Sequence, residues 1–103
     1  MAQRFDDKNP SESFSLTFDM SAGLSGAETL TGTPTASISV LSGTDASPSS
    51  VLVGSPTLAG ANLQVLVSVT GGLNAVDYEI KVVSATTNAS KTLALVGILP
   101  VRN

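Results

Sequence analysis

Residues 61–83 read ANLQVLVSVTGGLNAVDYEIKVV, and this stretch decides the fold. Apolar residues occupy every second position on both sides of a glycine pair: Leu63, Val65, Val67 and Val69 before it, and Val76, Tyr78, Ile80 and Val82 after it. Such alternation places one face of a β-strand in a core and the other face toward water. Gly71-Gly72 is a turn signal. The stretch therefore predicts two long antiparallel strands at the centre of a small β-domain.

Further strands are predicted on both sides of this centre. The clearest is 13–20, SFSLTFDM, in which large apolar residues alternate with polar ones. The other candidates are 36–41, 51–53, the apolar run 92–103, and 27–30 as a short edge strand or a crossing between sheets. About seven strands spaced by roughly 8–12 residues, with no helical period, predict an all-β fold. We expect an antiparallel β-sandwich, whose strand number matches the immunoglobulin-like plan.

Three local features refine this prediction. Asn88-Ala89-Ser90 is read as a hairpin loop before the last strand. Gly97 indicates a bulge or a close backbone approach within that strand. Tyr78 follows the Gly-rich turn, where immunoglobulin-like sandwiches place their tyrosine corner, although an ordinary alternating aromatic explains its position equally well.

Composition narrows the functional classes. The chain has 103 residues, no cysteine and no histidine, which excludes disulfides, thiolate metal sites and a Ser-His-Asp triad. Five basic residues against eight acidic ones argue against binding to nucleic acid. No apolar run approaches the length of a transmembrane helix, so we expect no membrane contact. The polar start, MAQRFDDKNP, differs from a signal peptide, so synthesis in a cytoplasm is expected.

The residues offer little catalytic chemistry. Asp77 and Glu79 share one face of a strand and could in principle act in acid–base catalysis or bind Ca²⁺. The opposite parity is the apolar one, however, so these carboxylates are expected to face water beside Lys81. We therefore predict no catalytic residue, no cofactor and no metal site, and we expect that the protein is not an enzyme.

Charge is distributed unevenly along the chain. Between Thr29 and Val76 the only charged residue is Asp45. Charge is the usual protection of exposed strand edges, so a long neutral stretch is unfavourable for a free monomer. This pattern predicts surfaces covered by copies of the same chain or by a larger lattice, and hence a homo-oligomer.

The first twelve residues form a separate unit in this interpretation, an N-terminal arm (1–12) before a single sandwich domain (13–103). The arm carries five of the charged residues, namely Arg4, Asp6, Asp7, Lys8 and Glu12. One interpretation is a frayed polar terminus. The other is an extended arm that docks on a neighbouring subunit with Phe5 as its apolar anchor.

Several short motifs carry a resemblance to a known group of proteins. They are Lys8-Asn9-Pro10-Ser11-Glu12, Phe18-Asp19-Met20, Leu24, Ala27-Glu28-Thr29-Leu30, the stretch 64–83, and Val101-Arg102 at the end. Together they resemble the small immunoglobulin-like structural proteins of tailed bacteriophages. The resemblance implies an immunoglobulin-like sandwich in the virion, assembled in the host bacterial cytoplasm.

Such virion proteins decorate or cement capsids, or belong to the neck, the tail or the base of fibres. The resemblance implies binding to other copies and to capsid, neck or tail proteins, with weak contacts summed by multivalency. The contact residues expected on the arm and the last strand are Arg4, Phe5, Asp6, Asp7, Lys8, Leu99, Val101 and Arg102.

The alternative function is a carbohydrate- or receptor-binding β-module of a fibre or an adhesin. Sugar sites usually combine exposed aromatic rings with polar groups in a groove. The sequence places Phe14, Phe18 and Tyr78 in the core, which makes this alternative the less favoured one.

Overall fold

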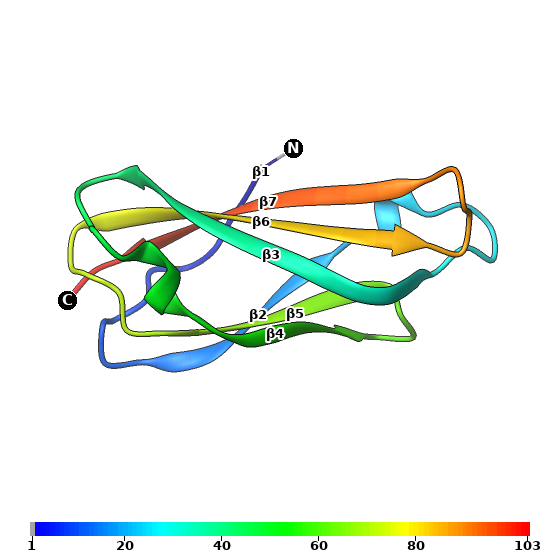
Figure 1. Ribbon diagram of the computed structural model, residues 1–103. Coiled ribbons are helices and arrows are strands. Elements are labelled where there is room, and N and C mark those ends of the chain that lie inside the picture. The colour runs from blue at the N-terminus through cyan, green and yellow to red at the C-terminus, as the bar shows by residue number, and fades with distance from the viewer. Residues whose placement is uncertain (1) are drawn as a thin grey trace.

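Two facing antiparallel sheets make up the molecule, as Figure 1 shows for the computed structural model, which describes residues 2–103. One sheet has the order β2-β5-β4 and the other has the order β7-β6-β3. Their strands are β2 (Ser13–Asp19), β3 (Leu30–Ser42), β4 (Leu52–Ala59), β5 (Gln64–Thr70), β6 (Val76–Thr86) and β7 (Thr92–Val101). A short segment, β1 (Ala2–Arg4), pairs in parallel with the outer edge of β7. The prediction of an all-β, sandwich-like fold is confirmed.

Only two short helical turns interrupt the strands. They are the 3-10 helices η1 (Ser21–Gly23) and η2 (Pro48–Val51). Among the described residues, no helix is long and apolar enough to cross a membrane.

The alternating residues predicted to point inward form the core. Phe18, Val65, Tyr78, Ile80 and Val82 have no exposed surface. They come from both sheets, so the two apolar faces bury each other. At the end of β6, Thr86 is paired with Leu30, the first residue of β3. The antiparallel ladder between β6 and β7 confirms the predicted hairpin loop that joins them.

The central stretch differs from the prediction in its strand partners. β5 pairs with β2 and β4, whereas β6 pairs with β3 and β7, so the two strands do not form a hairpin. The connection from Gly71 to Ala75 instead crosses from one sheet to the other (Figure 1). Gly71 and Gly72 both have positive φ, at 62° and 95°, and a Cβ on Gly72 would lie 2.9 Å from Val101 Cγ2. The glycines therefore turn the chain as predicted, but into the opposite layer.

Of the two alternatives for residues 27–30, the crossing between sheets is the correct one. Residues 27–29 are not part of a strand, and they lead from the sheet of β2 to Leu30, which begins the long β3 of the other sheet. The strand expected at 51–53 continues to Ala59 through a register shift between Val53 and Thr57. Glycine and proline in this segment suggested an end, but the bulge accommodates them without ending the strand.

Candidate functional site

The N-terminal segment lies against its own domain. Beyond β1, the backbone N–H of Phe5 donates to the carbonyl of Ile98 at 2.9 Å, and that of Lys8 donates to the carbonyl of Pro100 at 2.9 Å. The segment therefore continues along β7 instead of fraying or projecting toward a neighbour. The expected extended arm is not what this chain forms, and only Met1 of that arm lies outside the described residues.

Phe5 finds its apolar partner within the chain. Its ring meets Phe18 edge-on, with ring centroids 5.1 Å apart and an interplanar angle of 73°. Gly97 leaves the space for both rings, because a Cβ there would lie 2.5 Å from Phe5 Cε2 and 2.7 Å from Phe18 Cε2. The β6–β7 register shows no bulge at Gly97, so the predicted close approach is the correct alternative. It is an approach of aromatic side chains to the backbone.

Lys8 is the most unusual residue of this segment because its side chain is completely buried. Its ammonium donates to the carbonyl of Gly71 at 2.7 Å and to that of Asn9 at 3.0 Å, and it lies 5.8 Å from the centre of the Phe14 ring. Burial lowers the pKa of Lys8, and the charge of Glu12 partly offsets this effect. The ammonium thus ties the N-terminal segment to the turn between the sheets.

The residues predicted to contact partners differ in how far the fold buries their side chains. The side chains of Lys8, Leu99 and Val101 are fully buried within the chain, so these three present no free side chain to a partner, whereas Phe5 is half-buried against the core. The end of β7, from Leu99 to Val101, is buried, and the N-terminal segment pairs with the outer edge of this strand. Of the remaining four, Arg4, Asp6 and Asp7 are exposed, and Arg102 pairs with Asp77 at 2.7 Å.

A groove of about 310 Å³ lies between the N-terminal segment and β2. It is lined by Phe5, Asp6, Asp7, Glu12, Phe14 and Leu16. Three carboxylates therefore surround an apolar floor. Phe14 is 37% exposed here, which corrects its expected place in the core. It lies near the start of β2, at the end of the sandwich, where the opposite layer does not cover it.

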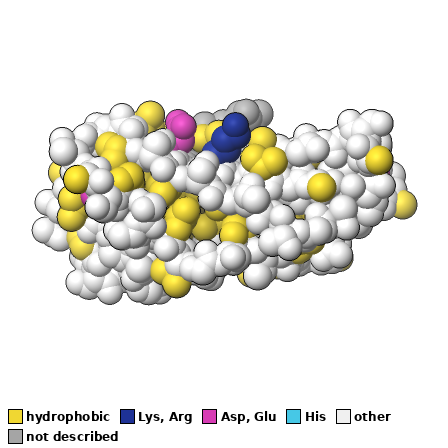
Figure 2. Space-filling view, viewed as in Figure 1, with side chains coloured by type: hydrophobic (Ala, Val, Ile, Leu, Met, Phe, Trp, Pro, Cys, Tyr) yellow, Lys and Arg dark blue, Asp and Glu magenta, His cyan; other side chains and the backbone are white. Residues whose placement is uncertain are grey.

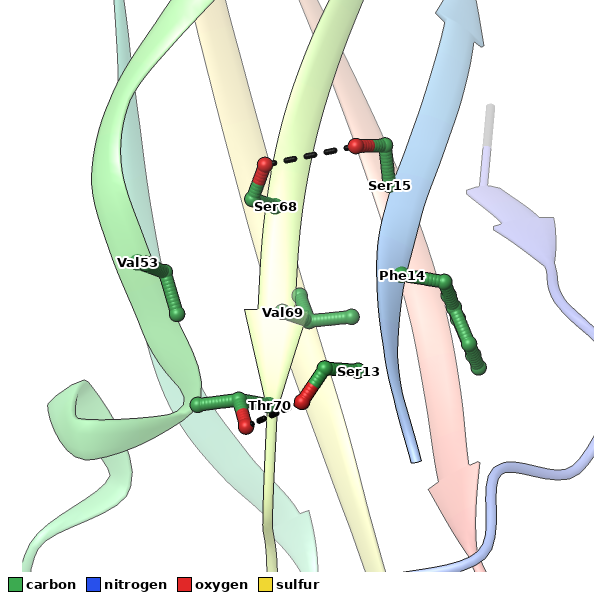
Figure 3. Close-up of a pocket in the computed structure, with 7 residues that line it drawn as sticks. All are labelled: Ser13, Phe14, Ser15, Val53, Ser68, Val69 and Thr70. Carbon is green, nitrogen blue, oxygen red and sulfur yellow. Dashed lines mark hydrogen bonds between the residues drawn. The ribbon is translucent and has the colours of Figure 1, made fainter. Parts of the chain in front are cut away.

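A second groove, of about 440 Å³, lies on the other side of Phe14 (Figure 3). Two pairs of hydroxyls cross from β2 to β5, Ser13 with Thr70 at 2.6 Å and Ser15 with Ser68 at 3.3 Å. Val53 of β4 and Val69 complete the lining. The hydroxyls lie on the outer face of β2 and β5, whereas the side chain of Phe14 points to the other side of β2 (Figure 3).

The third surface is the side of the sandwich where β3 and β4 lie next to each other. Both are the last strands of their sheets, and β3 is hydrogen-bonded to β6 alone. Neither strand contains a charged residue. Figure 2 shows hydrophobic side chains on the face crossed by β3, with few acidic or basic ones. The charge-free stretch of the sequence is therefore gathered on one side of the molecule.

The single charge of that stretch has a structural role that sequence reasoning missed. The buried hydroxyl of Tyr78 donates to Asp45 Oδ2 at 2.6 Å and accepts from the backbone N–H of Leu73 at 3.0 Å. The hydrogen bonds from Tyr78 and from the Ser47 backbone lower the pKa of Asp45, and burial raises the pKa of Tyr78. The position of Asp45 as the one charged residue in a neutral stretch was the feature of the sequence that could have indicated this role.

A charged cluster joins two loops at the far end of the sandwich. Glu28 accepts from the ammonium of Lys91 at 2.6 Å and from the amide of Asn88 at 3.0 Å. These bonds, with the backbone N–H of Ser25, lower the pKa of Glu28 from 4.5 to about 2. The cluster holds the loop before β3 against the β6–β7 hairpin.

Across residues 2–103, no group of three Asp or Glu side chains is close enough to hold a metal ion. Asp77 and Glu79 lie on the polar face of β6, opposite the buried Tyr78, as the alternation predicted. Comparison of the chain with family models, with curated proteins and with solved structures found no significant match.

Proposed function

We propose that the sandwich is immunoglobulin-like. The immunoglobulin plan places its second, fifth and fourth strands in one sheet and its third, sixth and seventh in the other. The orders β2-β5-β4 and β7-β6-β3 match this plan for strands two to seven, whereas β1 pairs with β7 and not with β2 as the first strand of the plan does. The hydroxyl of Tyr78 near the start of β6 contacts the backbone of Leu73, five residues upstream, as a tyrosine corner does.

We propose that the protein is a structural component that binds a repeating lattice through its strands. The observation that carries this proposal is the position of the neutral stretch, which supplies both edge strands, β3 and β4, on one side. Exposed, uncharged edges are templates for pairing with another chain. In an assembly they are covered, and no charge has to be desolvated to cover them.

The lattice we propose is the virion of a tailed bacteriophage, with the chain as a capsid decoration or cement protein or as part of the neck, tail or fibre base. The support is the resemblance in sequence together with the place of its residues. Lys8 and Arg102 belong to motifs at opposite ends of the chain, and the backbone N–H of Arg102 donates to the carbonyl of Lys8 at 2.8 Å. The first and the last of the resembling motifs thus meet in the fold.

Cosedimentation with empty phage capsids, tails and complete virions tests this function. We expect saturable binding to one of these particles, with many copies per particle. A chain that remains in the supernatant with all three would contradict the proposal.

A carbohydrate-binding function is the second candidate because the exposed Phe14 ring lines the groove beside the N-terminal segment together with three carboxylates. A glycan array with the wild-type chain and the Phe14→Ala variant distinguishes it. Leu41→Ala is the matched control, since Leu41 is 51% exposed and lies outside both grooves. Glycan binding lost only in Phe14→Ala would favour a sugar site, and no binding would remove this candidate.

A further inference from the structure

We propose that the free edge of β3, over residues 35–40, pairs in antiparallel with the same edge of a second copy of this chain. The inference deepens the proposed function, on which its biological meaning rests, because it names the surface and the partner through which copies meet. Four observations carry it: a free backbone, protection of the other edges, a symmetric residue pattern, and the absence of charge.

The backbone of this edge is free for pairing. From Thr35 to Val40 the register with β6 is continuous, and register shifts between Thr31 and Thr35 and between Val40 and Ser42 mark its limits. In the part of the chain that the structure describes, no backbone hydrogen bond outside this ladder involves residues 31–42. Six residues extend about 20 Å, so this free edge is long enough to accept another strand.

The other edges of the two sheets are less suitable. β1 covers β7. The edge of β4 is broken by a register shift between Val53 and Thr57, and this interval includes Pro56. The groove along β2 is lined by three carboxylates, which would repel their counterparts on a second copy. Only β3 offers a regular edge without a bulge or charge along its paired run.

The residue pattern of this edge is symmetric about Ile38. In an antiparallel pair centred there, Ile38 faces Ile38 of the second copy, each Ser37 faces a Ser39, and each Ala36 faces a Val40. An antiparallel pair of strands has two-fold axes both at hydrogen-bonded and at non-hydrogen-bonded residue pairs. A pair centred on Ile38 is therefore possible whether the backbone N–H and C=O of Ile38 point toward the free edge or toward β6. The dimer would be closed and isologous.

The side chains on each face match those they would meet. Ser37 and Ser39 are exposed, whereas Ala36, Ile38 and Val40 are half-buried on the side that faces the core. Hydroxyls therefore oppose hydroxyls on one face, and apolar side chains extend the core on the other. No charged residue occurs in β3, so two copies meet without like-charge repulsion. Because the edge of β3 matches an antiparallel copy of itself, we infer that the partner is a second copy of this chain.

Lysines placed on the exposed face of the edge test the inference. In Ser37→Lys/Ser39→Lys, two lysines of one copy would face two of the other, so we expect the dimer dissociation constant to rise at least about tenfold. Ser15→Lys/Thr17→Lys is the matched control, because both residues are exposed and two apart on β2. Sedimentation velocity over a concentration series measures all three proteins, and thermal melts establish that they fold.

Cysteine crosslinking tests the register without adding charge. The chain has no cysteine, so each engineered thiol is unambiguous. A mixture of Ser37→Cys and Ser39→Cys chains should form a disulfide dimer on mild oxidation, since facing residues lie within disulfide range. Either variant alone should crosslink much less. Equal crosslinking in all three samples, or none in any, would overturn the register and with it the inference.

The outcomes separate this inference from the proposed function. A wild-type chain that stays monomeric overturns the β3 dimer, and the lattice function still stands if the chain cosediments with phage particles. A dimer broken by the edge lysines supports the inference even if no particle binds the chain, a result that contradicts the proposed function. A monomer whose edge lysines abolish cosedimentation would show that β3 binds a different protein, which overturns the second copy as partner.

Discussion

The two outer edges of the sheet that contains β6 differ sharply. At the β7 edge, β1 and the following residues form a cover in which Phe5 meets Phe18 and Lys8 reaches the carbonyl of Gly71. At the β3 edge, no segment of the described chain pairs with the backbone. The first edge is satisfied within the chain, whereas the second is left for pairing with another chain.

This contrast explains the uneven distribution of charge in the sequence. The charges near the N-terminus lie beside the edge that the chain covers itself, and Lys8 is held in the interior there. Neutral residues supply the open edge, where a charge would hinder pairing. The uneven distribution of charge along the sequence thus corresponds to a difference in charge between two sides of one fold.

The largest expected effect concerns Phe18, the core residue of β2 that packs against the cover of the β7 edge. Phe18→Ala removes a ring with no exposed surface and should lower the free energy of unfolding by about 3–5 kcal/mol. Ile38→Ala on the open edge should cost only about 1–2 kcal/mol, because Ile38 is half-buried. Urea unfolding at low protein concentration measures both. Equal losses would contradict the looser packing of Ile38 at the open edge.

Lys8→Met should be the next largest change. The apolar stem is kept, but the carbonyl of Gly71 loses its donor, so we expect a loss of about 1–3 kcal/mol. Lys81→Met is the matched control, since Lys81 is exposed on β6, and it should change stability by no more than about 0.5 kcal/mol. The same urea assay applies, and a neutral Lys8→Met would contradict a stabilising role for the buried ammonium.

Tyr78→Phe tests whether the lone charge of the neutral stretch serves the fold. Loss of the hydroxyl leaves Asp45 and the N–H of Leu73 without this partner, at a cost of about 1–2 kcal/mol. Because Asp45→Asn weakens the same bond, the double variant should lose less than the sum of the two single losses. Additive losses in thermal unfolding would mean that Tyr78 and Asp45 act independently.

The smallest effect is a pH dependence away from both edges. The pKa of Glu28 lies at about 2 in the folded chain against an ordinary 4.5, so its ionised form favours folding. This stability is complete above pH 4.5 and is lost as the pH falls toward 2. Thermal melts between pH 2 and 6 should show a shallower decline for Glu28→Gln than for the wild type. Parallel declines of the melting temperature in the two proteins would show that Glu28 does not cause the loss of stability at low pH.

The sequence predicted the core better than it predicted the surfaces. Val65, Ile80 and their alternating neighbours are buried because strand parity is a local property. Phe14 shares the inward parity of β2 and is nevertheless exposed, since burial also depends on what the opposite layer covers.

The sites were harder to predict for the same reason. Lys8, Leu99 and Val101 were expected at a partner surface because charge near a terminus and an apolar last strand suggest contacts with other chains. The fold satisfies them internally, since β7 is covered by residues about ninety positions earlier, as in the pairing of Arg4 with Ile98. No local pattern encodes so distant a contact.

The sequence by itself determined the strand character, the inward parity and the turn at Gly71-Gly72, because each depends on residues within a few positions of one another. Only the tertiary structure decided that β5 and β6 lie in different sheets, that the N-terminal segment closes one edge, and that β3 leaves the other edge open. An alternating strand presents the same two faces whichever strand it pairs with. Pairing is chosen by the burial of all apolar faces together, so the sequence of one strand does not specify its neighbours.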